Sequence, residues 1–239
     1  MTPICRHLAT FVCSSLLLLQ SAAGQAETLQ PGQRLTFVLS ANKPNADEVR
    51  QKYFSYAFPK AQAVGMKEIT TFKPAKLIGT GNPDGSGLYL WPSKAAADAT
   101  RNDPVYIKDY KPLRSYAWKQ LQSIDMEITA PLDINLDKTK PHTIALLWLK
   151  DQKAYNQYYE GTQALRDKLG AKTLLKLPGI RYDKLTEGEI APPDLVVLLQ
   201  WNTEADIEGY TKSADFQANH EYFTQGVETM ELYRLGFWN

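Results

Sequence analysis

Histidine is the side chain best suited to acid–base chemistry near neutral pH, and this sequence has three of them. His142 begins an apolar stretch directly after a proline, and His220 follows an asparagine in the second half of the chain. His7 lies in an N-terminal segment that we expect to be removed. A three-histidine zinc site is therefore not expected. His142 and His220 are candidates for proton transfer, and the alternative for each is an ordinary solvent-facing histidine.

Four residues spaced like one face of a helix form a second candidate feature. Tyr155, Tyr158, Tyr159 and Thr162 fall at positions i, i+3, i+4 and i+7. Such a face can line an apolar pocket, in which the Tyr158 hydroxyl would orient a ligand or transfer a proton. The same spacing is typical of a helix packed on a sheet. The packing interpretation is the better supported, because Tyr53 occupies the corresponding place in the first half.

Further candidates lie in apolar segments that resemble strands. A polar side chain in such a strand needs a partner if it faces the interior, and residues of this kind often mark a binding site. Tryptophans in the same strands can line a cavity or fill the core. The ligand-binding candidates are Trp148, Tyr155, Tyr159, Lys176, Gln200, Trp201 and Arg234. Strand periodicity alone does not say which face of the sheet each of them occupies.

The sequence lacks the common cofactor and metal motifs. Residues 79–87 are rich in glycine but lack the spacing of a phosphate-binding loop, and no lysine-serine or lysine-threonine pair follows. There is no Gly-x-Ser-x-Gly elbow, no His-Glu-x-x-His motif and no Cys-x-x-Cys-His haem attachment site. Both cysteines, Cys5 and Cys13, lie in the N-terminal segment. We therefore predict neither a cofactor nor a metal ion.

Residues 1–26 have the order of a cleavable secretory signal peptide. Arg6 provides positive charge, a short apolar run over residues 8–19 follows, and small residues precede the expected cleavage site. This run is too short for a membrane-spanning helix, which needs about 20 apolar residues. We expect cleavage after Ala26, with cleavage after Gly24 as the alternative. The expected location is the periplasm, with secretion as the alternative. No membrane anchor is expected after cleavage.

The remaining chain has balanced charge, with 26 basic and 26 acidic residues. A balanced chain lacks the basic surface that nucleic-acid binding needs, and it lacks the polybasic stripe of a membrane-surface helix. No nucleic-acid partner is therefore expected. A small hydrophobic ligand is compatible with this composition, of which 44% is hydrophobic and 11% aromatic.

The two halves of the chain repeat one pattern at a spacing of about 105 to 110 residues. Apolar strands are predicted over residues 35–39 and 143–149, and helices over about 46–64 and 152–169. Each half continues with two strands, a helix and a last strand. Gly65 and Gly170 suit the ends of the first helices, and Ser93 and Thr203 suit the starts of the second helices.

This order is β-α-β-β-α-β twice, which is the order of two tandem ferredoxin-like repeats. Residues 27–130 form the first repeat, 131–141 a polar linker and 142–239 the second repeat. The strands are apolar at positions of both parities, so both sheet faces are expected to be buried. We therefore predict an α+β fold in which one chain forms an intramolecular dimeric α+β barrel, and a monomer with an internal pseudo-dimer.

The second half also resembles a known family. The stretch PPDLVVLLQW from Pro192 to Trp201 and the stretch SADFQA at residues 213–218 are similar to a bacterial family of small dimeric α+β-barrel proteins of unknown function, the family numbered thirteen-thirty. The resemblance covers residues 143–235. The wider superfamily includes antibiotic-biosynthesis monooxygenases, haem-degrading enzymes and stress-responsive barrel proteins. It implies a cleft between sheet and helices but no particular activity.

Two functional hypotheses follow. The first is a barrel that binds or transforms a small hydrophobic or aromatic molecule, by analogy a cofactor-independent monooxygenase or a cyclase-like enzyme. The second is a non-catalytic scaffold or partner-binding barrel whose cavity is filled by side chains. A pocket of about 300 Å³ or more with convergent polar groups would separate them. Because both remaining histidines lie in the second repeat, we expect only one of the two sites to be used.

Overall fold

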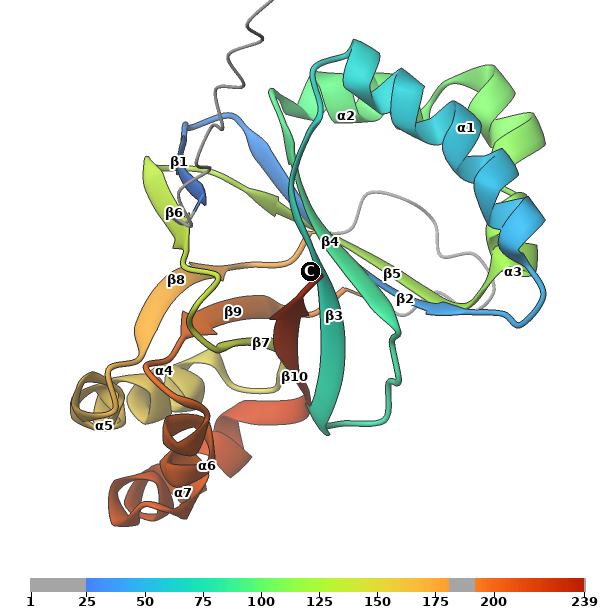
Figure 1. The fold of residues 1–239 in the computed structure, drawn as a ribbon. Coiled ribbons are helices and arrows are strands. Elements are labelled where there is room, and N and C mark those ends of the chain that lie inside the picture. Colours follow the sequence, from blue (N-terminus) through green and yellow to red (C-terminus); the bar gives the residue numbers. More distant parts are fainter. Residues whose placement is uncertain (1–24, 181–191, 239) are drawn as a thin grey trace, which may run out of the picture.

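The computed structural model describes residues 25–180 and 192–238 of the chain, and Figure 1 shows their arrangement. The predicted signal peptide lies outside these residues except for Gln25 and Ala26, and most of the polar loop predicted over residues 186–194 also lies outside them. No helix within the described residues is long and apolar enough to cross a membrane.

The described chain forms the predicted β-α-β-β-α-β unit twice. The first repeat contains β2 (Arg34–Asn42), α1 (Asp47–Ala63), β3 (Lys67–Ile78), β4 (Gly85–Trp91), α2 (Lys94–Arg101), the short π-helical turn η1 (Tyr106–Tyr110), α3 (Leu113–Ala117) and β5 (Trp118–Glu127). The second repeat contains β7 (His142–Leu149), α4 (Gln152–Gly161), α5 (Gln163–Lys168), β8 (Lys172–Leu177), β9 (Leu195–Gln200), α6 (Glu204–Lys212), α7 (Ala214–Gly226) and β10 (Val227–Phe237). This order confirms the prediction of an α+β fold built from two ferredoxin-like repeats.

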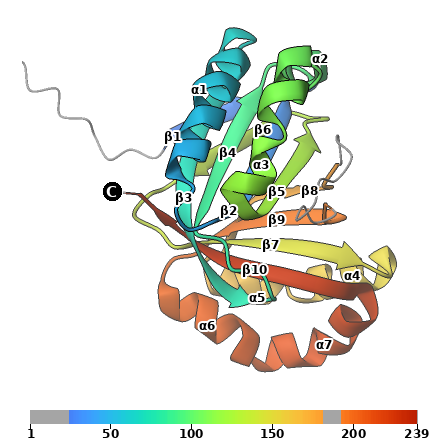
Figure 2. The same ribbon diagram turned by 90° about the vertical axis from the view of Figure 1, so that its right-hand side faces the viewer.

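The strands of the two repeats form one antiparallel sheet in the order β5-β2-β4-β3-β10-β7-β9-β8. Pairing between β3 and β10 joins the two halves. At the far edge, backbone hydrogen bonds of 2.6 and 3.3 Å link Asp125 of β5 to Ile180, just beyond β8. The sheet therefore curves into a barrel. Helices α1–α3 lie outside it on one side and α4–α7 on the other (Figures 1 and 2).

Strand side chains alternate between the barrel interior and the helices, as a pleated strand requires. Leu35, Phe37 and Leu39 of β2 belong to the large buried cluster inside the barrel, together with Ile144 and Leu146 of β7. The residues between them face the helices. Both faces of each half of the sheet are therefore covered, which confirms the expectation drawn from the apolar residues at both parities.

Local signals place the ends of the helices where the sequence predicted them. Ser93 and Thr203 each accept a backbone N–H bond at the start of a helix, and Thr203 forms a reciprocal capping box with Asp206. Gly65 and Gly170 follow the helices of the two repeats with φ angles of 90° and 64°. These left-handed conformations are readily adopted by glycine, which lets the chain turn into β3 and β8.

The helix predicted over residues 152–169 is divided into α4 and α5. Thr162 ends α4 and precedes α5 with a ψ of 7°. Its hydroxyl donates to the carbonyl of Tyr158 at 2.9 Å, four residues earlier. The same carbonyl also accepts the backbone N–H of Thr162 at 3.0 Å. A threonine that bonds back in this way often bends a helix.

The predicted linker contains a strand. Within residues 131–141, β6 (Leu132–Leu136) pairs antiparallel with β1 (Gln25–Leu29). Leu29, Ile134 and Leu136 are fully buried and join the cluster inside the barrel. The alternating residues Asp133 and Asn135 face solvent, and they gave the segment its linker-like polar composition.

Candidate functional site

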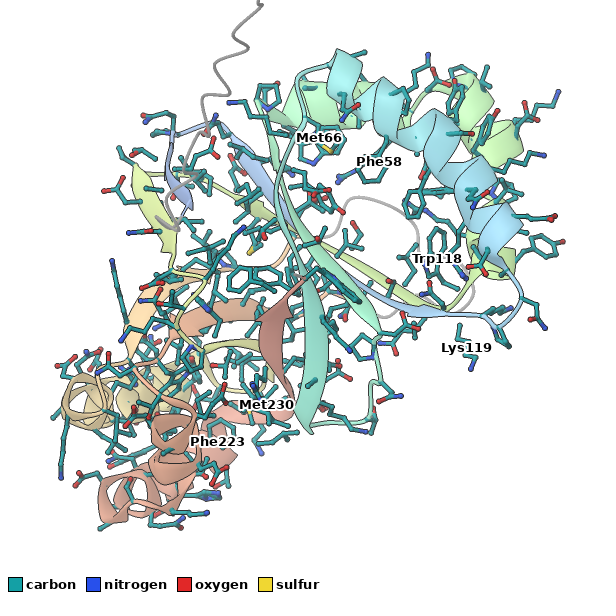
Figure 3. All side chains as sticks on the ribbon, in the orientation of Figure 1. Phe58, Met66, Trp118, Lys119, Phe223 and Met230 are labelled. Carbon is teal, nitrogen blue, oxygen red and sulfur yellow. The ribbon has the colours of Figure 1, made fainter. Side chains whose placement is uncertain are left out.

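A cavity of about 370 Å³ lies in the first repeat, between its helices and the outer face of its sheet. Figure 3 labels Phe58, Met66 and Trp118 around this space, while Lys119 points away from it. Met66 lies near the C-terminal end of α1 and Trp118 near its N-terminal end. We call this space the first-repeat cavity. Its position matches the cleft between sheet and helices that the superfamily resemblance implies.

The floor of the first-repeat cavity consists of small residues on the outer face of the sheet. Ser40 of β2, Gly85 and Gly87 of β4 and Ser123 of β5 all line it. A Cβ atom at Gly85 would meet only the Ser40 hydroxyl, at 3.3 Å. The absence of larger side chains at Ser40 and Gly85 leaves the space open above this part of the sheet, whereas the ring of Tyr89, another lining residue, occupies the place of a side chain at Gly87.

The second repeat carries larger side chains at the same places. The register of β2 with β4 matches that of β7 with β9, so Ser40 corresponds to Leu147, Gly85 to Leu195 and Gly87 to Val197 (Leu147, Leu195 and Val197 pack in one buried cluster). The helices differ in the same way. At the repeat spacing, Ala57 and Ala61 of α1, which line the cavity, correspond to Thr162 and Arg166, which are both fully buried.

Aromatic side chains of α1 form the roof of the cavity. Tyr53, Phe54 and Phe58 line it, and with Ala57 and Ala61 they occupy successive turns of one helix face. Tyr53 packs edge to face against Trp118, with ring centroids 5.1 Å apart. The roof is therefore apolar and shaped by interlocking rings.

A chain of polar groups lies at the Trp118 end of the cavity. The hydroxyls of Tyr53 and Tyr106 are 3.0 Å apart, and Nε of Arg114 donates to the Tyr53 hydroxyl at 3.2 Å. The Arg114 guanidinium also lies 5.8 Å from each of the two tyrosine rings. These groups line the cavity and can form hydrogen bonds with an oxygen atom of a ligand.

Asp103 fixes the position of Tyr106 in this chain. Its carboxylate accepts the backbone N–H of Tyr106 at 2.8 Å, the Tyr56 hydroxyl at 2.8 Å and the Lys60 ammonium at 2.9 Å. These bonds, with the backbone N–H of Tyr106 first among them, lower the pKa of Asp103 to about 2. The ionised carboxylate therefore ties η1 to α1 throughout the physiological pH range.

A buried ion pair lies at the Trp91 end. Arg101 forms a bidentate bond with Asp125, and the side chains of the two residues are 12% and 3% exposed. Thr36 donates to Asp125 and accepts the indole N–H of Trp91 at 3.0 Å. The hydroxyl of neighbouring Thr100 is buried with no hydrogen-bond partner among the described residues.

The predicted catalytic residues are not brought together at one point. His142 is fully buried inside the barrel, with Nδ1 2.9 Å from the carbonyl oxygen of Lys140, and burial lowers its pKa. Tyr158 lies on the opposite face of the sheet, where its hydroxyl is 3.0 Å from that of Tyr210 and burial raises its pKa. His220 is half-buried on α7 and shares its aromatic neighbour Phe216 with Tyr158.

Tyr155 and Tyr159, two of the predicted ligand-binding residues, both lie close to a third, Lys176. The ring of Tyr159 lies 3.7 Å from the Lys176 ammonium and 3.8 Å from the Arg166 guanidinium, and the Lys176 ammonium is also 5.4 Å from the ring of Tyr155. Burial, followed by the charge of Arg166, lowers the pKa of Lys176. Tyr155 is buried in the cluster between α4 and the sheet, and burial raises its pKa.

The remaining predicted residues have separate surroundings. Trp148 packs against the cluster inside the barrel. Trp201 donates its indole N–H to Thr143 at 2.8 Å. Gln200 accepts a backbone N–H from residue 137 at 3.2 Å, and Arg234 pairs with Glu204 at 2.9 Å.

Among the described residues that line the first-repeat cavity, none is a predicted site residue. Titratable side chains directed the sequence analysis to the second repeat, whereas the cavity arises from small residues in the first. The available signal was the internal repeat itself. Glycine and serine on outward strand positions of one repeat align with leucine and valine in the other, and that difference in volume predicts a space.

The described lining does not fit a haem group, which the resemblance to haem-degrading barrels raises as a candidate. Haem iron is usually held by histidine, cysteine or methionine, and sometimes by tyrosine. The described lining contains no histidine and no cysteine. Of its three tyrosines, Tyr53 and Tyr106 are hydrogen-bonded to each other, and burial raises the pKa of Tyr89 to about 12, which disfavours the phenolate that would bind iron. Met66 lies at the other end of the cavity.

Comparison with solved structures shows the fold that the chain shares. The structure of an anthrone oxidase-like protein matches with a TM-score of 0.55 and 10% identity, covering 87% of this chain and 94% of that one. A mutant chlorite dismutase from Candidatus Nitrospira defluvii matches with a TM-score of 0.50 and 10% identity, covering 87% and 92%. Both likenesses extend over the two repeats, so the chain has the fold of a dimeric α+β barrel.

The sequence comparisons add no closer relationship. No protein-family model matches the sequence, and no curated protein is significantly similar to it. The resemblance of residues 143–235 to the family numbered thirteen-thirty therefore stays a prediction.

Proposed function

We propose that this protein binds a small, largely apolar, ring-containing molecule in the first-repeat cavity. The volume of about 370 Å³ falls within the range of natural ligand pockets, about 300 to 1,000 Å³. Aromatic rings from α1 and the sheet form its walls, and polar groups converge at its two ends. This combination is typical of sites in which apolar contacts provide affinity and a few polar groups set orientation.

The observation that carries the proposal is the difference between the repeats. Protein interiors are close-packed, and an unfilled space lowers stability because the surrounding atoms lose contacts. The second repeat fills the corresponding positions with Leu147, Leu195 and Val197, so the fold accommodates side chains there. Among the described residues, the space at these positions is filled in the second repeat and open in the first, and a ligand best explains this difference. The alternative of a scaffold predicts filled space in both repeats.

The polar ends indicate how the ligand would be oriented. An oxygen atom of the ligand would join the hydrogen-bonded chain of Tyr53, Tyr106 and Arg114 near Trp118. At the other end, the Thr100 hydroxyl lacks a partner among the described residues, and a buried hydroxyl is normally hydrogen-bonded. We propose that binding takes place outside the cytoplasm, on the strength of the signal-peptide pattern in residues 1–26.

Replacing Ser40 and Gly85 together by leucine tests the proposal, since it copies the second repeat. Native mass spectrometry of protein purified from the periplasm should show a bound small molecule on the wild type and none on the double variant. Added phenylnaphthylamine, a neutral aromatic probe, should fluoresce in the wild-type cavity only. The matched control is Ser40→Ala, which removes the hydroxyl without filling the space and should bind like the wild type. Equal probe binding by all three proteins would contradict the proposal.

A further inference from the structure

Trp238, which follows the last strand of the second repeat, lines the cavity of the first repeat. It reaches that position because β10 pairs with β3, and Phe237 stands opposite Phe72 in this pairing. Phe237 turns into the barrel, where its ring lies 5.1 Å from that of Phe72 and 5.4 Å from that of His142. Because successive side chains of a strand point to opposite faces, Trp238 is directed outward beside Thr71 of the cavity floor.

The indole of Trp238 is unusually exposed for a cavity wall. It is 54% exposed, and Phe54 of the roof is 41% exposed, whereas Tyr53, Trp91, Tyr106 and Trp118 of the same lining are all buried. The two exposed rings therefore mark the rim of the cavity, one from each repeat. The ammonium of Lys73 lies 5.8 Å from the Trp238 ring, a distance typical of a cation–π contact that steadies an indole.

The pseudo-symmetry of the fold makes this tryptophan informative. Asp125 of β5 corresponds to Arg234 of β10, because they pair with the equivalent residues Thr36 and Thr143. Counting onward, the residue that corresponds to Trp238 is Thr129, a small and exposed residue. The aromatic rim residue is thus present at the repeat with the open cavity and absent from the corresponding place at the other repeat.

We propose that Trp238 is a specificity-determining residue that covers a planar ring of the ligand at the rim of the first-repeat cavity. This inference rests on the proposed function and adds the shape of the ligand at the rim. A planar ring can stack on the indole face and bury its exposed surface, which a flexible alkyl chain does less well. The second repeat thereby completes the binding site of the first.

The test compares an aromatic and an alkyl probe on the whole mature protein. Phenylnaphthylamine fluorescence gives the affinity for a planar ring, and its displacement by dodecanol gives the affinity for a neutral alkyl chain. Trp238→Ala should weaken phenylnaphthylamine binding by about 3- to 10-fold and leave dodecanol affinity nearly unchanged. Trp238→Phe keeps a ring at the rim and should retain most of the aromatic affinity. A fall in the ratio of the two affinities is not expected from a general loss of structure.

The outcomes separate this inference from the proposed function. If Trp238→Ala weakens both probes equally, or neither, the selective role of Trp238 is wrong. The Ser40→Leu, Gly85→Leu double variant then decides the function, because loss of both probes in that variant would still support a ligand cavity. If the double variant binds both probes as the wild type does, the probes bind elsewhere and both proposals are overturned.

Discussion

The two repeats have the same order of helices and strands, but they differ in the side chains that fill the space between the helices and the sheet. At one end they are alike, since Trp91 donates to Thr36 at 3.0 Å and Trp201 donates to Thr143 at 2.8 Å. The tryptophan is the last residue of the third strand in the first repeat and directly follows the third strand in the second, and the threonine lies in the first strand of each repeat. Beyond this shared contact, the first repeat has glycine, serine and alanine where the second has larger side chains.

The difference shows which part of the repeat the fold requires. The tryptophan–threonine bond fastens two neighbouring strands in both repeats, and the alternating interior residues fill the barrel in both. The helix-facing residues further along the strands have no such common role. They are large in the second repeat, where they stabilise it, and small in the first, where we propose a ligand. On this proposal, one repeat is a support and the other a binding site.

The largest expected effect comes from the ion pair that distinguishes the two repeats. Asp125 in the first repeat is buried with Arg101, whereas at the corresponding position of the second repeat Arg234 pairs with Glu204 and both side chains are about half exposed. Asp125→Asn leaves a buried guanidinium without its carboxylate, and we expect it to lower the free energy of unfolding by about 4 kcal/mol. Arg234→Gln should cost less than about 1 kcal/mol, because an exposed pair is screened by solvent.

Urea unfolding of the two variants and the wild type measures this difference. A double variant in which Arg101 is also replaced, Asp125→Asn with Arg101→Met, serves as the control. It removes both buried charges and should recover part of the lost stability. Equal losses of stability for Asp125→Asn and Arg234→Gln would show that the two ion pairs contribute equally and do not distinguish the repeats.

The next effect is expected from a reciprocal exchange at corresponding positions. Leu147 is 2% exposed in the second repeat, and Leu147→Ser removes its packing and buries a hydroxyl. We expect the free energy of unfolding to fall by about 3 kcal/mol. The reverse change, Ser40→Leu, enters open space in the first repeat and should alter stability by less than about 1 kcal/mol in either direction.

Thermal and urea unfolding of both single variants checks the exchange. Because leucine and serine are exchanged in opposite directions, the comparison measures the room available at the two positions and not the effect of the residue types. If Ser40→Leu were as destabilising as Leu147→Ser, the first repeat would have no room at this position, and the contrast between the repeats would be lost.

The sequence predicted the fold well because the fold depends on patterns of many residues. Strand alternation, Gly65 and Gly170 after the helices, and the caps at Ser93 and Thr203 all recur in both halves, so each repeat supported the assignment of the other. Strand β6 was missed because its five residues have a polar face. The pairing of β3 with β10, which carries Trp238 to the first repeat, depends on long-range contacts that no local pattern specifies.

The site was harder to predict than the fold. A cavity is a sum of small side chains from separate strands and a helix, and no single residue such as Ser40 or Gly85 indicates it. Histidines and tyrosines were the candidates because the chemistry of these side chains is evident from the sequence alone. The structure places His142 inside the barrel and Tyr158 in a packed cluster, where burial is the largest cause of the shifts in their pKa values.

The smallest expected effect concerns a third pair of corresponding positions, Leu35 and His142. Both lie at the start of the first strand of a repeat, and both are fully buried inside the barrel. Burial lowers the pKa of His142 below its ordinary value of 6.5. The unfolded chain therefore takes up a proton at a higher pH than the folded protein does. Stability from this residue is complete above about pH 6.5 and is lost as the pH falls from there through the folded-state pKa.

His142→Leu copies the first repeat and removes this titration. Between pH 7.5 and about pH 5, the free energy of unfolding of the wild type should fall more steeply than that of the variant, by an amount on the order of 1 kcal/mol. Urea unfolding of the wild type and the variant at several pH values measures the two slopes. Parallel pH profiles for the wild type and His142→Leu would mean that the folded protein tolerates a protonated His142, and that this interior position is more polar than its counterpart at Leu35.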